Sequence, residues 1–240
     1  MKKNVKKIFQ IFGINLSKFN AINVSGYQTV QALKVHKINV VFDVGANVGQ
    51  FANELREYGY KGKIVSFEPL PQAYDGLVSK AYGDENWVIH PRCAIGSMAG
   101  DIEINVAANS ASSSILPMLS AHEDAAPHAK YTHKELASMI TLDSVLEQYA
   151  SPDDNLFIKI DTQGYEWSVL DGAEQAVKQC RGVLLELSLI PLYDGQKLWL
   201  DLVNRLSATQ HQVFVIQPGF TDNKTGQTLQ VDGLFFKTEI

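Results

Sequence analysis

Residues 40–51, VVFDVGANVGQF, join an apolar strand to a glycine turn and then to a stretch that favours a helix. Gly45 and Gly49 lack a Cβ atom, so the backbone can pass close to a ligand at both positions. The free backbone N–H groups at the start of a helix favour a carboxylate or a phosphate group. This order of strand, glycine turn and helix predicts a nucleotide-binding site in an α/β fold.

A second part of the pattern supports the same site. Glu68 stands at the C-terminal end of the next apolar strand, nineteen residues after Gly49. A carboxylate at that place can accept hydrogen bonds from both hydroxyl groups of a ribose. The glycine turn and the acid together therefore predict a nucleoside ligand more strongly than either does alone.

The glycine spacing separates two classes of cofactor. Dinucleotide sites carry G-x-G-x-x-G, whereas this turn reads G-x-x-x-G with Asp43 two residues before the first glycine. A carboxylate at Asp43 would repel a pyrophosphate, but it suits a cationic amino group such as that of S-adenosylmethionine. We expect this cofactor to contact Asp43, Gly45, Ala46, Asn47, Gly49, Gln50, Glu68, Cys93, Ala94 and Asp161.

From residue 39 onward, short β-branched runs alternate with segments of helical period. This pattern is typical of a mostly parallel sheet that helices cover on both faces, a doubly wound α/β fold. The last two strands are joined by PGFTDNKTGQT, which leaves no room for a helix, so we expect the last strand to run antiparallel to its neighbour. The expected strands are 39–44, 62–68, 86–92, 155–160, 182–188, 211–216 and 231–237.

One stretch breaks the alternation. Residues 107–137 are rich in serine and alanine and show little periodicity. A long irregular segment inside a compact domain is usually a lid or a binding loop, so we expect one here. The preceding run DIEINV, residues 101–106, is expected to form a strand at a sheet edge.

Composition narrows the class of protein. A chain of 240 residues with 45% hydrophobic residues can bury one sizeable core. Its apolar runs are strand-sized and far shorter than the roughly 20 residues of a membrane span. Cys93 and Cys180 are too few for a disulfide scaffold and form no CxxC pair, which favours a reduced, cytoplasmic compartment.

The charge is unevenly distributed. Residues 1–42 contain seven lysines and no acid, which leaves 14 basic against 26 acidic residues in the remainder. Nucleic-acid surfaces need clustered lysine and arginine, so an acidic main body argues against a nucleic-acid partner and favours small-molecule chemistry.

Residues 1–38 form an extension before the expected catalytic domain at 39–240. Its first twenty residues, MKKNVKKIFQIFGINLSKFN, place apolar residues beside lysines, as in an amphipathic helix that rests on anionic lipid. The alternative is a helix that caps the domain. We favour the cap, because short basic and apolar N-terminal helices commonly pack on a sheet. A signal peptide is not expected, since Gln10 and Asn15 interrupt the apolar region.

Four segments resemble the FkbM family of methyltransferases in their order along residues 39–237. They are DVGANVGQF, FEP, TLDSVL at 141–146 and FIKIDTQGYEWSVLDGA at 157–173. The resemblance implies a seven-stranded, Rossmann-like class I methyltransferase fold with strand order 3-2-1-4-5-7-6. It also implies methyl transfer from S-adenosylmethionine to oxygen. Gln163 departs from the family pattern, in which many members carry an acid there.

Methyl transfer is an in-line displacement, so the enzyme has to hold an acceptor oxygen opposite the sulfur and expel water. Reacting atoms lie over the C-terminal strand ends of a parallel sheet, where Asp161 and Glu186 are expected. Asp161 is the first candidate for a general base, and an N-cap of the next helix is its alternative role. Lys159, inside the apolar strand FIKID, needs a partner if it is buried, and Asp161 or Glu186 could supply it.

Metal assistance would require a cluster of suitable ligands near the site. Asp161 and Glu186 lack an adjacent acid that would complete an octahedral Mg²⁺ site, and the three histidines in 107–137 match no compact zinc spacing, so we expect no metal.

The expected acceptor is a hydroxyl on a small molecule, a sugar or polysaccharide, or a natural-product precursor. The alternatives are an NAD(P)-dependent oxidoreductase and a non-catalytic binding module that keeps the cofactor fold.

Overall fold

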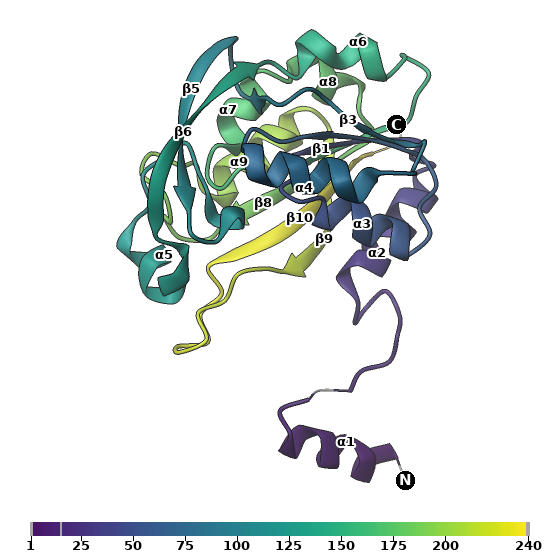
Figure 1. Cartoon of the computed structure of the whole chain (residues 1–240). Helices are drawn as coiled ribbons and strands as arrows, with labels where there is room; N and C mark the ends of the chain where they lie inside the picture. Colours follow the sequence, from purple (N-terminus) through teal and green to yellow (C-terminus); the bar gives the residue numbers. More distant parts are fainter. Residues whose placement is uncertain (1, 15, 239–240) are drawn as a thin grey trace.

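A seven-stranded sheet forms the centre of the protein, in a computed structural model that describes residues 2–14 and 16–238 (Figure 1). The strand order is β3-β2-β1-β7-β8-β10-β9. Neighbours from β3 to β8 run parallel, and β10 is antiparallel to both β8 and β9. The strands are β1 (Val40–Val44), β2 (Lys63–Phe67), β3 (Trp87–Ile89), β7 (Leu156–Ile160), β8 (Gly182–Ser188), β9 (His211–Pro218) and β10 (Gln230–Lys237).

This topology confirms the expected order 3-2-1-4-5-7-6 and the antiparallel last strand. The third strand is shorter than the predicted 86–92, because it pairs with β2 only from Trp87 to Ile89. The chain then leaves the sheet at Pro91, which has no N–H to donate to a further ladder bond.

Helices cover both faces of the sheet, and alternate strand residues bury against the two layers. Val41 packs in the core formed with α2, α3 and α4, whereas Phe42 packs in the core formed with α6 to α9. The helices of the first layer are α2 (Ser25–Val35), α3 (Gln50–Glu57) and α4 (Pro71–Ala81). Those of the second are α6 (Leu146–Tyr149), α7 (Glu166–Asp171), α8 (Glu174–Gln179) and α9 (Trp199–Ala208).

A second, three-stranded sheet corrects the prediction of an irregular segment at 107–137. Its order is β4-β6-β5, with β4 (Ala94–Ile95), β5 (Gly100–Ala107) and β6 (Tyr131–Ile140). Most of β6 pairs antiparallel with β5, and β5 lies at the sheet edge, as expected for DIEINV. Most side chains from residue 132 to 136 are exposed, so this strand lacks the apolar alternation that would have revealed it. The short helices η1 (Ser110–Ser112), α5 (Ser120–Ala125) and η2 (Pro127–Ala129) lie between the two strands.

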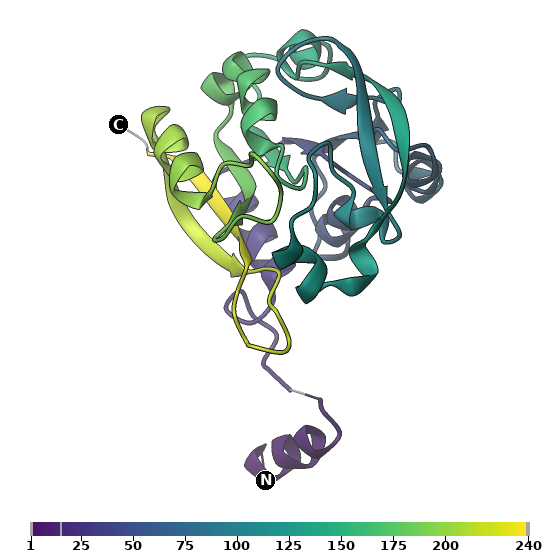
Figure 2. The same ribbon diagram turned by 90° about the vertical axis from the view of Figure 1, so that its left-hand side faces the viewer.

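The N-terminal region also differs from the favoured prediction. Helix α1 (Lys2–Ile11) stands apart from the rest of the chain in both views (Figures 1 and 2). The helix that covers the sheet is α2, whose Val30 and Leu33 are completely buried. Helix α2, which precedes the expected boundary at residue 39, therefore packs with the sheet. Among the described residues, no helix has both the length and the apolar character that a membrane span requires.

The small sheet docks on the main body where the chain leaves α7. Gly172 ends this helix, and a Cβ atom added there would overlap the carbonyl oxygen of Gly96, which directly follows β4. The backbone N–H of Asp143 also donates to the carbonyl oxygen of Gly172, at 3.0 Å. Because β4 leads on from Cys93, this close approach fixes one wall of the cavity described below.

We therefore expect Gly172→Ala to lower the free energy of unfolding by about 1–3 kcal/mol, because the new methyl group overpacks this contact. Urea denaturation monitored by circular dichroism measures the change. Gly100→Ala is the matched control, since a Cβ atom at Gly100 meets nothing within 4 Å. Equal stabilities for the two variants would contradict the close approach.

Candidate active site

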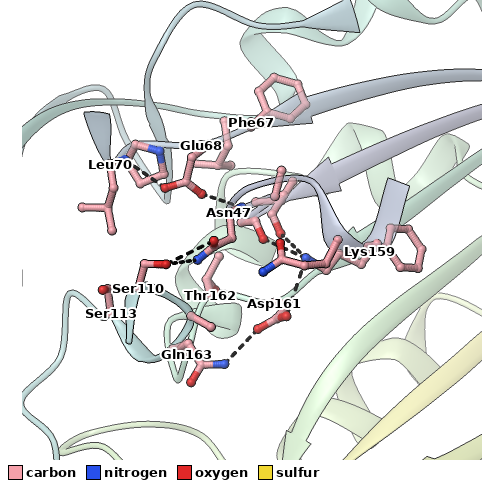
Figure 3. A pocket seen from close by; sticks show the side chains of 18 of the residues that line it. Asn47, Phe67, Glu68, Leu70, Ser110, Ser113, Lys159, Asp161, Thr162 and Gln163 are labelled. Atoms are coloured by element: carbon pink, nitrogen blue, oxygen red, sulfur yellow. Dashed lines mark hydrogen bonds and ion pairs between the residues drawn. The ribbon is translucent and has the colours of Figure 1, made fainter. Parts of the chain in front are cut away.

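A cavity of about 660 Å³ lies over the C-terminal ends of β1, β2 and β7 (Figure 3). This volume falls in the usual range of small-molecule sites. At the β2 end its lining includes Phe67, Glu68 and Leu70, and at the β7 end it includes Lys159 and Asp161. The cavity therefore lies at the carboxyl edge of the parallel strands, where the sequence predicts the site.

The glycine turn after β1 forms the floor between these two ends. Gly45 and Gly49 have φ angles of 73° and 79°, in the left-handed region that favours glycine. A Cβ atom at Gly45 would overlap the backbone carbonyl oxygen of Asp161, so only glycine lets the β1 and β7 loops cross here. Gly49 instead faces Leu77 and Trp87, and it caps α3 as a packing residue outside the cavity lining.

Glu68 is held by the backbone on both sides. Its two carboxylate oxygens accept hydrogen bonds from the N–H groups of Asn47, at 2.8 Å, and Leu70, at 2.9 Å (Figure 3). The residue is only 4% exposed. Burial raises the pKa of its carboxyl to about 7, although the two N–H donors and the Lys159 charge oppose this shift. Each oxygen keeps a free lone pair for a hydroxyl donor.

Lys159 extends from β7 to the end of β1, where it contacts two carboxylates. Its ammonium nitrogen lies 3.1 Å from Oδ1 of Asp43, 2.8 Å from the carbonyl oxygen of Gly45 and 3.6 Å from Oδ2 of Asp161. Burial alone would lower the pKa of Lys159, but the carboxylates of Asp43 and Asp161 raise it overall. The lysine is therefore a buried cation with two acidic neighbours.

Asp43 differs from its predicted place. It is completely buried, also accepts a hydrogen bond from the Ser66 hydroxyl at 3.3 Å, and does not line the cavity. The carboxylate thus faces Lys159, so of the two expected arrangements, a direct or a water-mediated hydrogen bond to a cofactor ammonium, the direct one does not match this geometry. The acid is present two residues before Gly45 because it neutralises a lysine on the neighbouring strand.

Asp161 is not the N-cap of α7, the alternative role considered for it. The carboxylate of Glu166 accepts hydrogen bonds from the N–H groups of Thr162, at 3.0 Å, and Gly164, at 3.1 Å, and so closes the turn itself. Asp161 is free to face the cavity. It accepts a hydrogen bond from the Gln163 amide, between Nε2 and Oδ1 at 2.9 Å (Figure 3).

Gln163 joins three side chains from separate elements. Its Nε2 also donates to Oε2 of Glu186 on β8, at 2.8 Å, while its Oε1 accepts a hydrogen bond from the Tyr193 hydroxyl, at 2.7 Å. The phenol donor fixes which end of the amide faces the two carboxylates. Burial and the nearby Asp161 charge raise the pKa of Glu186 well above its usual value, and Glu186 does not line the cavity.

The serine-rich segment after β5 folds over the cavity. The Ser110 hydroxyl lies 3.2 Å from both side-chain amide atoms of Asn47 (Figure 3), and the Ser114 hydroxyl donates to the carbonyl oxygen of Gln163 at 2.6 Å. Both serines line the cavity. This part of 107–137 therefore has the position expected of a binding loop.

Several polar residues of the cavity are not among the sequence-predicted site residues. Glu54 on α3 and Asp232 on β10 line it, and the Glu54 charge contributes to raising the pKa of Asp232, which burial chiefly raises to about 7. Glu54 follows the predicted Gln50 by one helical turn, so the 3.6-residue period could have indicated it. Asp232 gave no local signal, because β10 comes late in the chain, far in sequence from the glycine turn and Glu68.

Most predicted site residues reach the cavity lining. They are Gly45, Ala46, Asn47, Gln50, Glu68, Cys93, Ala94, Lys159 and Asp161. Asp43, Gly49 and Glu186 lie behind the lining. Burial raises the pKa of the Cys93 thiol to about 12, so this residue offers the cavity an uncharged surface. Across residues 2–14 and 16–238, no three His, Cys, Asp or Glu side chains are grouped so that they could hold a metal ion.

Comparison with known proteins identifies a matching family and a curated relative. The methyltransferase FkbM domain matches residues 43–216. A hexuronic acid methyltransferase, AglP, from Haloferax volcanii is 27% identical over 153 residues. That match covers 62% of this chain and 56% of the relative, so it spans just over half of that protein.

Two solved structures give weaker matches. A putative RNA methyltransferase from Pyrococcus horikoshii matches with a TM-score of 0.47 and 12% identity over 89% of this chain and 82% of that one. A precorrin-6y C5,15-methyltransferase from Geobacter metallireducens also matches with a TM-score of 0.47 and 12% identity, over 92% of this chain and 93% of that one.

The raised pKa of Glu68 generates a prediction about cofactor binding. An ionised carboxylate is a stronger acceptor for ribose hydroxyls than a protonated one. Affinity for S-adenosylhomocysteine should therefore rise with pH up to about 7, approaching about tenfold per pH unit on the acid side. Isothermal titration calorimetry at several pH values measures this slope.

The control is Glu68→Gln, which keeps the size of the side chain but has no proton to lose. It should bind more weakly at high pH, and its affinity should vary little with pH. The buried Glu166 remains in this variant, so a slope as steep as that of the unaltered protein would assign the pH dependence to another group.

Proposed function

The chain belongs to the FkbM family of methyltransferases, and from that premise we propose that it transfers a methyl group from S-adenosylmethionine to a hydroxyl group of a sugar or glycan. The observation that carries the proposal is the pairing of Glu68 and Asp161 at opposite ends of one cavity, with the Gly45 turn between them. The hexuronic acid methyltransferase relative supports a sugar acceptor.

The residues at the β2 end fit the nucleoside part of this cofactor. Glu68 is buried, and its remaining lone pairs suit the two ribose hydroxyls. Cys93 and Ala94 offer small apolar surfaces for the adenine ring. The backbone of Gly45 to Asn47 leads from this end toward β7, and we assign it to the methionine part. The cofactor, when bound, supplies a methyl group made electrophilic by its sulfonium.

Asp161 is the proposed general base. Its carboxylate faces the cavity, and Gln163 and Lys159 hold it from two sides. Asp161 would accept the proton of the acceptor hydroxyl as that oxygen takes up the methyl group, and the electron pair of the broken bond would remain with the cofactor. Lys159 and Glu186 act on this step through Asp161 and Gln163, so we treat them as positioning residues.

The proposed function has a direct test. We expect S-adenosylmethionine and S-adenosylhomocysteine to raise the melting temperature, whereas NAD(P) should not, because the turn lacks the G-x-G-x-x-G spacing of dinucleotide sites. A panel of neutral sugars, amino sugars and hexuronic acids, incubated with methyl-labelled cofactor, should yield a labelled sugar. Cofactor binding with label in none of the sugars would overturn the acceptor class, and a larger shift with NAD(P) would overturn the family chemistry.

Asp161→Asn should retain cofactor binding and reduce kcat by on the order of 10² to 10⁴, because the amide keeps the Gln163 contact but accepts no proton. Turnover of the best acceptor in the panel measures this loss. Asp171→Asn is the matched control, since Asp171 pairs with Arg205 at the end of α7, outside the cavity lining. Turnover of Asp161→Asn at the level of this control would leave Asp161 without a catalytic role.

A further inference from the structure

Helix α1 carries apolar side chains to the solvent. Ile11, the last residue of the helix, is 80% exposed, and Phe12, directly after it, is 74% exposed. Val5 and Phe9 are also exposed. In Figures 1 and 2 the helix stands away from both sheets and their covering helices. Such a surface needs a partner, because a cluster of large apolar side chains in water is unfavourable.

The sequence of this helix separates two kinds of residue. Val5, Phe9 and Phe12 follow one another at spacings of four and three residues, which places them on one face of a helix. Lys6 and Lys7 fall outside this apolar face, with Lys7 on the opposite side of the helix. An apolar stripe with a lysine-rich face is the pattern of helices that lie in a membrane interface.

The charge distribution selects the kind of surface. Residues 1–42 contain no acid, whereas the rest of the chain has an excess of acidic over basic residues. An anionic surface therefore attracts α1 and repels the body. A nucleic acid would satisfy the lysines but not Phe9 and Phe12, while the acyl boundary of a membrane accepts both kinds of side chain.

Residues between α1 and α2 connect α1 to the rest of the protein. Residues 16–24 lead into α2, and they contact the body at Phe19, whose ring lies 4.8 Å from that of Tyr27 and 5.9 Å from that of Tyr58. The N-terminal region is therefore attached to the body just before α2. Ser25, the first residue of α2, also lines the cavity, so docking of α1 would hold one rim of the cavity near the docked surface.

From the exposed apolar stripe and the opposed charges, we propose that α1 docks on an anionic lipid membrane. Its apolar residues lie in the acyl boundary and its lysines contact the headgroups. This inference is independent of the proposed reaction, because it concerns residues outside the cavity.

Sedimentation with vesicles tests the inference. The full chain should pellet with vesicles of phosphatidylcholine and phosphatidylglycerol, much less with phosphatidylcholine alone, and less again in high salt. Lys6→Glu with Lys7→Glu should lower the partition coefficient by about 30-fold or more, since each lysine near such a surface contributes about fivefold. Phe9→Ser with Phe12→Ser should lower it even in low salt.

The matched control is Lys61→Glu with Lys130→Glu, which changes the net charge equally at exposed sites away from α1. Calorimetry with S-adenosylhomocysteine verifies that each variant is folded. Full-length protein that stays in the supernatant would overturn the proposal, as would an equal loss in the control pair. Vesicle-independent dimerisation that disappears in Phe9→Ser with Phe12→Ser would assign the apolar face to a second copy of the chain instead.

Discussion

The buried ion pair between Asp43 and Lys159 is the interaction on which the rest of the site depends. The two residues are direct partners in the parallel ladder of β1 and β7, and both are almost fully buried. Removing water from two charges is costly, and loss of either partner would leave an uncompensated charge in the core, which typically costs about 3–5 kcal/mol. Because Lys159 also contacts the Gly45 carbonyl and Asp161, the pair fixes the two loops that cross at Gly45. The glycine turn and the candidate base are thereby placed by one lysine.

Around this single lysine the protein gathers more carboxyl groups than one cation can balance. Burial raises the pKa values of Glu68, Glu166 and Asp232 to about 7, so near neutral pH each is on the edge of ionisation. Ionising them in the folded state is unfavourable, and this weakens the fold as pH rises from their unfolded values toward 7. A ligand whose hydroxyls donate to Glu68 relieves part of that cost. The same burial that weakens the free protein therefore increases the gain from binding a ribose.

The sequence predicted what local patterns determine. Most strand positions, the glycine turn and Glu68 follow from apolar runs, glycine spacing and an acid at a strand end, whereas the strand order was implied only by the resemblance to the FkbM family. The ion pair of Asp43 was not predicted, because its partner Lys159 lies far along the chain and only the β1–β7 register brings them together. Strand β6 was not predicted, because most of its first residues are exposed and show no alternation of apolar and polar side chains. The position of α1 was not predictable either, since the same amphipathic pattern suits a helix that packs on the domain and a helix that stands apart from it.

Gln163 shows how a departure from a family pattern can be explained by its surroundings. The residue has a φ angle of 53°, and the hydroxyl of Ser114 holds its carbonyl oxygen, so its side chain is directed into the space between Asp161 and Glu186. An amide offers two N–H donors, one for each carboxylate, and an oxygen for the Tyr193 hydroxyl. An acid at position 163, which the family resemblance predicts, would place a third carboxyl group between two others. At least one of the three would then have to carry a proton to supply the missing hydrogen bond. With glutamine there, the contact between positions 161 and 163 needs no shared proton, and Asp161 remains able to accept one from an acceptor hydroxyl.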